Sequence, residues 1–167
     1  MAGAGNVAAA SDGGIDWLSP TPAEPETMKR ATYEDVLNAP ENKVAEILDG
    51  ELFLSPRPAP PHTVASSEIG MAIGPPFHRG RGGPGGWWIL DEPELHLGSD
   101  VLVPDLAGWR RERMPTYPVV SWFELPPDWV CEVLSPGTRK LDLTDKRRIY
   151  AAAGVAIGHG IGRFGCF

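Results

Sequence analysis

The sequence predicts a mixed α/β domain with a central sheet flanked by helices, and three observations indicate this class. A β-hairpin pattern occupies "KVAEILDGELFLSP", residues 43–56. Apolar runs typical of strands follow between residues 87 and 134. Apolar residues at helical spacing lie on both sides of these runs, within residues 61–77 and 141–155. Helices and strands mixed along one chain in this way are typical of helices packed on a sheet.

The first expected elements are a short helix and the hairpin. In "TYEDVLNAP", Thr32 is the expected N-cap, and Glu34 and Asp35 fall in the first turn, where the helix dipole favours acids. Pro40 ends this helix. In the hairpin, the dipeptide "DG" at 49–50 separates two apolar stretches, a pattern typical of a tight turn.

The next expected elements are a helix and three strands. "PHTVASSEIGMAIGPPF" carries apolar residues at helical spacing until Pro75, and "RGRGGPGG" predicts a loop. "WWILDEPELHL" predicts one strand with a kink at Pro93, and "DVLVPDLAGW" predicts another. "RRERMPTYPVVSWFELPP" has too many prolines for a regular element, and "DWVCEVLSP" predicts the third strand.

The last expected helix lies in "LDLTDKRRIYAAAGV", where Leu143, Ile149 and Ala153 share one face and Gly154 is the expected C-cap. The segment 156–167, "AIGHGIGRFGCF", has glycine at positions 158, 160, 162 and 165. Each glycine weakens a strand, so we expect no core strand there.

The length of 167 residues fits one domain. Residues 1–28 are rich in Ala, Gly, Pro and acids, cannot bury much apolar surface, and are expected to form a disordered leader. We therefore divide the chain into this leader, a folded domain over 29–155, and an atypical glycine-rich tail over 156–167.

The overall composition excludes several classes of protein. A net charge of −7 argues against non-specific coating of nucleic acid, although a local basic site remains compatible with it. Two cysteines, Cys131 and Cys166, are too few for a disulfide framework or a structural zinc site, which favours a cytoplasmic location. No apolar run approaches the ~18–20 residues of a membrane span, and the first residues make a poor signal peptide.

Three carboxylates lie inside apolar strand patterns: Glu46 in "VAEIL", Asp105 in "VPDLA" and Glu132 in "VCEVL". Taken singly, each is compatible with a turn, a cap or a salt bridge. Burying several like charges together requires a cation, because a buried charge is costly unless it is paired. Mg²⁺ prefers such hard oxygen ligands, and it can activate water and stabilise charge on a phosphoryl oxygen.

A lysine would complete such a site by positioning the water or the phosphate. Lys140 and Lys146 both follow Glu132, and Lys146 is favoured because the helix after the strand can direct it back towards the sheet. The alternative for Lys146 is a solvated helix face.

The motifs "PD" at 104–105, "EVLSPGT" from Glu132 and "DKRRIYAAAGV" from Asp145 resemble the Uma-two endonuclease family. This family belongs to the PD-(D/E)XK nuclease superfamily. "TYEDVL", "EILDGELFLSPRP" and the histidine of "PPHTVAS" are similar to its N-terminal half, so that the resemblance spans roughly residues 31–155.

The resemblance implies a restriction-endonuclease-like fold and a metal-dependent phosphodiesterase site. Asp105 and Glu132 would be the ligands of Mg²⁺, or of Mn²⁺, and Glu46 would be an additional acid of the catalytic site. His62 would lie near the site, or would serve only as a capping or surface histidine.

The chain departs from the family pattern at two places. The superfamily places a lysine two residues after the second acid, where this chain has Leu134, so the lysine role passes to Lys146 or Lys140 or is lost. The family continues after "AAAGV" with an apolar strand. The glycine-rich segment here therefore predicts that the C-terminal strand or strands are lost, through truncation or a frame shift.

Basic residues gather in "HRGRGG", "RRER" and "TRKLDLTDKRR", as a DNA-binding enzyme requires, although Arg110, Arg111 and Arg113 fit a solvated loop equally well. Four tryptophans could stack on bases or pack in the core: Trp87, Trp88, Trp109 and Trp122. DNA is the expected partner, no membrane is expected, and a homodimer is compatible with the sequence.

We carry three hypotheses for the function. The first is a magnesium-dependent endonuclease that hydrolyses DNA phosphodiester bonds, with Glu46, Asp105, Glu132 and Lys146 in the catalytic site. The second is a nuclease-fold module that binds nucleic acid or protein without catalysis. The third is a small structural domain whose acids are all salt-bridged.

Overall fold

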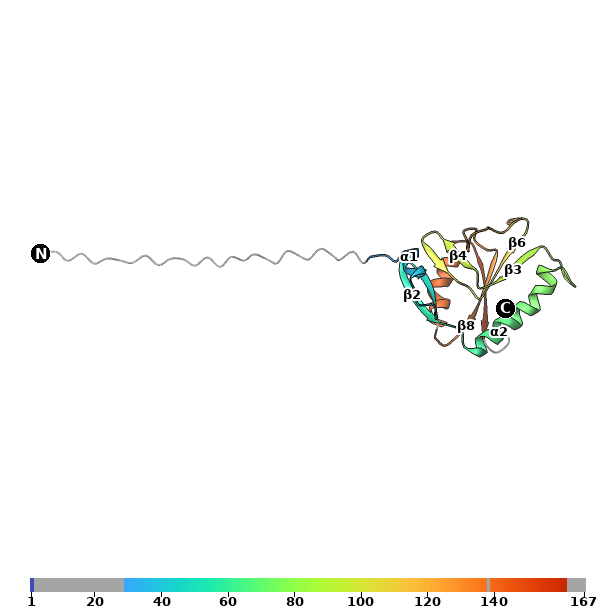
Figure 1. The fold of residues 1–167 in the computed structure, drawn as a ribbon, viewed down its shortest axis with the longest axis horizontal. Coiled ribbons are helices and arrows are strands. Elements are labelled where there is room, and N and C mark those ends of the chain that lie inside the picture. The colour runs from blue at the N-terminus through green and yellow to red at the C-terminus, as the bar shows by residue number, and fades with distance from the viewer. Residues whose placement is uncertain (2–28, 138, 162–167) are drawn as a thin grey trace.

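The computed structural model describes Met1, residues 29–137 and residues 139–161, the last three by their backbone alone. The expected leader therefore lies outside the described residues apart from Met1, as do residues 162–167 of the expected tail. Figure 1 shows the described part as two sheets covered by helices. The described residues include no helix long and apolar enough to cross a membrane.

The first two predicted elements are confirmed. Helix α1 (Tyr33–Leu37) begins after Thr32, whose backbone N–H and hydroxyl both donate to the Asp35 carboxylate, at 2.7 and 2.9 Å. Strands β1 (Lys43–Leu48) and β2 (Glu51–Pro56) form the antiparallel hairpin. Its turn residues Asp49 and Gly50 both have positive φ, 55° and 85°, as the tightest hairpin turns require.

The hairpin and the other strands of the described residues divide between two mixed sheets. The five-stranded sheet has the order β2-β1-β5-β4-β7, with β4 (Glu94–Leu97), β5 (Asp100–Leu102) and β7 (Trp122–Phe123). The four-stranded sheet has the order β3-β6-β8-β9, with β3 (Trp87–Asp91), β6 (Leu106–Arg110), β8 (Trp129–Leu134) and β9 (Ala156–Ile161). The mixed α/β class is confirmed, but two sheets replace the single central sheet that we expected.

The two expected strands over 87–97 and 100–109 each break into two strands that enter different sheets. The first break falls at Glu92, whose φ of 43° is rare for a residue with a side chain, followed by Pro93. The second break spans 103–105 and contains Asp105. Asp105 therefore lies where the chain leaves one sheet and enters the other.

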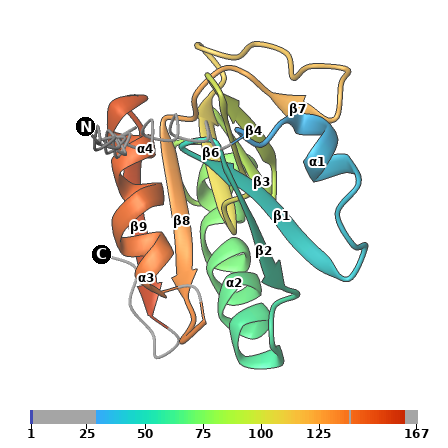
Figure 2. The ribbon, with the colours of Figure 1, turned by 90° about the vertical axis from the view of Figure 1, so that its left-hand side faces the viewer.

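Two long helical segments pack against the four-stranded sheet. Helix α2 (Pro60–Ile73) continues as the π-helical turn η1 (Gly74–His78), so the helical path runs past Pro75, where we expected it to end. The second segment runs through α3 (Arg139–Leu141), η2 (Asp142–Lys146) and α4 (Arg147–Ala152). Figure 2 shows β8 between this second segment and α2. Gly154 follows with φ 73°, as expected for a helix C-cap.

The core joins both sheets to α4. Leu95 and Leu102 from one sheet and Trp109 and Val130 from the other share a buried cluster with Tyr150 of the helix. Trp109 is fully buried and stacks on Phe123 at 4.7 Å, so core packing accounts for this tryptophan.

The expectation that the C-terminal strand is lost is wrong for residues 156–161. Strand β9 pairs in parallel with all of β8, from Trp129 opposite Ala156 to Leu134 opposite Ile161. This ladder consists of backbone hydrogen bonds, which form independently of the side chains on the strand. At Gly158 a side chain would be crowded, because an added Cβ would lie 3.2 Å from Nε1 of Trp129. The glycine that we interpreted as a weakness provides room for a tryptophan.

Candidate active site

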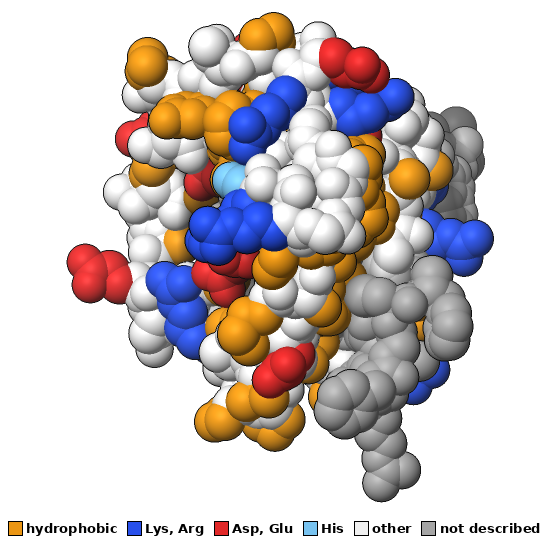
Figure 3. Space-filling view, turned by 90° about the vertical axis from the view of Figure 1, so that its right-hand side faces the viewer, with side chains coloured by type: hydrophobic (Ala, Val, Ile, Leu, Met, Phe, Trp, Pro, Cys, Tyr) orange, Lys and Arg blue, Asp and Glu red, His pale blue; other side chains and the backbone are white. Residues whose placement is uncertain are grey.

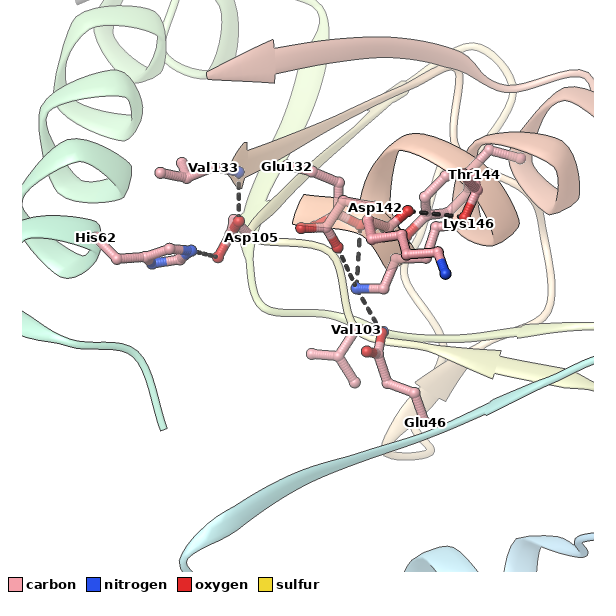
Figure 4. A network of polar contacts seen from close by, with 11 residues as sticks. Glu46, His62, Val103, Asp105, Glu132, Val133, Asp142, Thr144 and Lys146 are labelled. Atoms are coloured by element: carbon pink, nitrogen blue, oxygen red, sulfur yellow. Dashed lines mark hydrogen bonds and ion pairs between the residues drawn. The ribbon is translucent and has the colours of Figure 1, made fainter. Parts of the chain in front are cut away.

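The three carboxylates singled out in the sequence come together where the two sheets meet. Glu46 lies on β1, Asp105 directly precedes β6, and Glu132 lies on β8. The β6–β8 pairing sets Leu106 opposite Cys131, which brings the Asp105 side chain beside β8. There its Oδ2 accepts the backbone N–H of Val133 at 2.6 Å. Figure 4 shows this arrangement.

Glu46 links the hairpin to the chain segment that leads to Asp105. Its Oε1 accepts the backbone N–H of Val103 at 2.8 Å and lies 2.9 Å from Nζ of Lys146. Glu46 is buried, so these two contacts satisfy a charge that would otherwise be costly.

Lys146, and not Lys140, is the lysine of the cluster. Its side chain is buried, and its Nζ lies 2.9 Å from Glu46, 3.5 Å from Glu132 and 3.5 Å from Asp142. Lys140 is exposed on α3, and its backbone carbonyl accepts the Thr144 hydroxyl. The solvated-face alternative for Lys146 is therefore wrong.

The charges of the cluster decide the protonation of Lys146. Burial on its own lowers the pKa of Lys146, but the negative charges of Glu132, Glu46 and Asp142 outweigh it and raise the pKa above its ordinary value. Lys146 therefore keeps its proton at neutral pH.

The surroundings also raise the pKa of Glu132, which disfavours the charged form of this carboxyl. Burial raises the pKa of Glu132 to about 8; Lys146 opposes this rise, and the charges of Glu46, Asp142 and Asp105 add to it. The raised pKa of Lys146 and the raised pKa of Glu132 are compatible, because a single ammonium faces three carboxylates and cannot offset all of them. The cluster therefore has an excess of negative charge that a further cation would relieve.

His62, near the start of α2, completes the arrangement on the other side of Asp105. Its Nε2 lies 3.3 Å from Oδ1 of Asp105, and its Nδ1 is buried with no hydrogen-bond partner among the described residues. The hydrogen bond to Asp105 raises the pKa of His62, although burial acts against the rise.

We did not single out two further residues of the cluster, Asp142 and Tyr150. Tyr150 donates its hydroxyl to Oε1 of Glu132 at 2.9 Å, and Asp142 contacts Lys146. Asp142, Lys146 and Tyr150 follow one another at intervals of four, the spacing that places side chains on one helix face. This polar stripe is readable in the sequence, beside the apolar stripe of Leu143, Ile149 and Ala153 on the same segment. The turn that carries Asp142 and Lys146 is π-helical, a local geometry frequent at functional sites.

The cluster opens into a cleft of about 280 Å³, so that a ligand can reach it. The lining includes Glu46, His62, Asp105, Glu132, Asp142 and Lys146. A wider groove of about 680 Å³ follows α2 and shares His62, Glu92 and Asp105 with the cleft. The two spaces therefore adjoin at Asp105.

The donor set fits one mode of metal binding and not another. Over residues 29–137 and 139–158, no group of three or more His, Cys, Asp or Glu side chains is arranged to hold a metal ion. An ion held wholly by protein ligands therefore does not fit. Mg²⁺ is commonly held by one or two carboxylates, with waters and substrate phosphate as its other ligands. Asp105 and Glu132, which line the cleft beside surplus negative charge, fit that mode.

Some arginines are engaged in contacts within the protein, and others are exposed to solvent. Arg110 and Arg113 are paired with Asp128, and Arg111 lies over the Trp88 ring at 3.9 Å. Most of "RRER" is thus engaged within the protein. Arg79 and Arg81, in the glycine-rich loop after η1, are exposed and form no ion pair within the described part of the chain. Figure 3 shows one face of the molecule, where basic and acidic side chains both lie beside a band of hydrophobic ones.

Comparisons with known proteins agree with this picture. The family model "Uma2: Putative restriction endonuclease" matches residues 30–158. A crystal structure of "a putative nuclease belonging to DUF820" from Anabaena variabilis is similar in fold, with a TM-score of 0.66 and 22% identity, over 78% of this chain and 74% of that one. No curated protein matches the chain. Because the family match spans most of the sequence, the protein belongs to the Uma2 family and has a restriction-endonuclease-like fold.

Proposed function

We propose that the protein is a divalent-metal-dependent endonuclease that hydrolyses phosphodiester bonds of DNA. The observation that carries this proposal is the meeting of Asp105 and Glu132 at an open cleft, with the Lys146 ammonium behind Glu132. Membership of the Uma2 family and the restriction-endonuclease-like fold support a nuclease. The excess negative charge of the cluster supports the need for a cation.

Asp105 and Glu132 would hold Mg²⁺ or Mn²⁺. When bound, the ion supplies activated water and stabilises negative charge on the phosphoryl oxygens. Asp105 is fixed for its role from both sides, because Val133 donates to Oδ2 and His62 contacts Oδ1. Hydrolysis forms a bond from water oxygen to phosphorus and breaks the bond to the leaving sugar oxygen; the water loses a proton, and the leaving oxygen gains one.

Lys146 is assigned an electrostatic role. Its raised pKa keeps it protonated, so it does not accept a proton from water. Its contacts with Glu46 and Glu132 hold both carboxylates in place, and its charge favours an approaching phosphate. Glu46 contributes by holding Lys146 and, through Val103, the segment before Asp105.

The rest of the DNA strand would follow the groove along α2 towards Arg79 and Arg81. Their loop is packed against η1. The backbone N–H of Arg81 donates to the carbonyl of Pro75 at 2.8 Å, and Gly83 lies so close to Pro76 that a side chain at this position would clash. Asp91 and Glu92 also line the groove and repel phosphate. We therefore place only the phosphates that flank the scissile one outside the cleft, at the rim that carries these arginines.

The test is plasmid nicking in Mg²⁺ or Mn²⁺, with calorimetric titration of the same ions into the same samples. Wild type is expected to bind metal and nick DNA, and Asp105→Asn is expected to lose both, because it removes one of two charged ligands. Asp145→Asn is the matched control, since Asp145 lies in η2 but has no contact with the cluster among the described residues. A folded wild type that neither binds metal nor nicks DNA would overturn the proposal.

A second candidate function is nucleic-acid binding without cleavage. The observation that favours it is that Lys146 already contacts three carboxylates, which gives these acids a cation without any metal. DNA binding that is independent of metal, with no nicking, would select this function over the first.

A further inference from the structure

The clearest unassigned group in the cluster is the Tyr150 hydroxyl. Resting on the proposed function, we propose that Tyr150 is a positioning residue, which orients Glu132 for the metal without touching metal or substrate. Its hydroxyl donates to Oε1 of Glu132 at 2.9 Å. Lys146 contacts the same oxygen at 3.5 Å.

Two donors on a single oxygen fix how the carboxylate is turned. With Oε1 engaged by Tyr150 and Lys146, the role of metal ligand falls to Oε2. Figure 4 shows the carboxylate of Glu132 between Lys146 on one side and Asp105 on the other. An orientation fixed in advance spares the protein the cost of ordering this ligand when metal binds.

The surroundings of Tyr150 suit a positioning role. Its ring is fully buried in the core cluster with Trp109 and Val130, so the hydroxyl has little freedom to move.

The competing explanation is that Tyr150 only fills the core. The chain offers a matched control for it, because Tyr33 donates to Oε1 of Glu94 at 2.7 Å outside the cleft. Tyr33→Phe and Tyr150→Phe each remove one tyrosine–glutamate hydrogen bond and keep the ring. A structural role predicts that both lower the melting temperature and that neither changes metal binding.

The experiment is Mn²⁺ titration by calorimetry into full-length wild type, Tyr150→Phe and Tyr33→Phe, with a thermal melt of each sample. We expect Tyr150→Phe to bind Mn²⁺ roughly ten- to a hundredfold more weakly, as when an outer partner of a metal ligand is removed. Nicking by this variant is expected to need correspondingly more Mn²⁺ and to approach the wild-type rate at saturation. Tyr33→Phe is expected to match wild type in Mn²⁺ affinity and in nicking.

The outcomes separate this inference from the proposed function. If wild type binds Mn²⁺ and nicks DNA while Tyr150→Phe binds Mn²⁺ equally well, the positioning role is overturned and the nuclease stands. If wild type binds no Mn²⁺, both fall.

Discussion

The described part of the molecule contains two clusters in which a tyrosine donates to a glutamate, and they differ in what surrounds the glutamate. Glu132 is 3% exposed and shares one ammonium with Glu46 and Asp142 beside an open cleft. The side chain of Glu94 is 25% exposed, and its Oε1 lies between the Tyr33 hydroxyl and His96, each at 2.7 Å. The first cluster gathers like charges, whereas the second contains a single acid with two partners.

The second cluster is held together mainly by its rings. His96 stacks on Trp122 with 5.1 Å between ring centroids, and Tyr33 meets both rings edge-on. These contacts fasten α1 and β7 to β4. A tyrosine–glutamate bond therefore does not by itself mark a functional site in this protein; the surplus of buried charge facing a cleft does.

The largest expected effect follows from removing the cation of the first cluster. Lys146→Met should lower the free energy of unfolding by roughly 3–5 kcal/mol, because it leaves buried carboxylates without a counter-charge. Lys140→Met should change it by less than about 0.5 kcal/mol, since that side chain is exposed. Urea unfolding of both variants measures the difference. Equal stabilities would show that Lys146 does not compensate the cluster.

The next effect concerns pH. The pKa of Glu132 is about 8 in the folded protein, above its ordinary value of 4.5, so the stabilisation from holding this proton is complete below about pH 4.5 and is lost as pH rises through about 8. The raised pKa of His62 acts in the same direction. The metal-free protein should therefore melt at lower temperature at pH 8 than at pH 5, and Glu132→Gln should show a shallower decline. Identical slopes for the two proteins would contradict the assignment.

The smallest effect is expected in the second cluster. Glu94→Gln should cost about 1 kcal/mol of stability, because it weakens hydrogen bonds to Tyr33 and His96 without leaving a buried charge unpaired. DNA nicking should be unchanged, because Glu94 does not line the cleft. A loss of nicking that exceeds the loss of folded protein would remove the functional distinction between the two clusters.

The sequence by itself determined the family, the fold class and the main acids of the candidate site. Local signals were sufficient for the hairpin at Asp49–Gly50 and for the capped helix after Thr32, because a few neighbouring residues decide such turns and caps. Carboxylates inside apolar runs stood out because burial of charge is costly, and the structure brings Glu46 and Glu132 to the same lysine.

Only the tertiary structure decided which partners these residues meet. The glycine-rich segment forms a strand because its backbone pairs with β8, and Gly158 leaves the space that the Trp129 side chain needs. Neither the pairing nor this contact can be predicted from local strand propensity. The same holds for the crossing between two sheets at Asp105. The sequence already favours Lys146 over Lys140, and the tertiary structure supplies its three carboxylate partners. Contacts between segments that are distant in the sequence decide these features. The hydrogen bond from Tyr150 to Glu132 is one such contact, because it joins a helix to a strand and no spacing in the sequence specifies it.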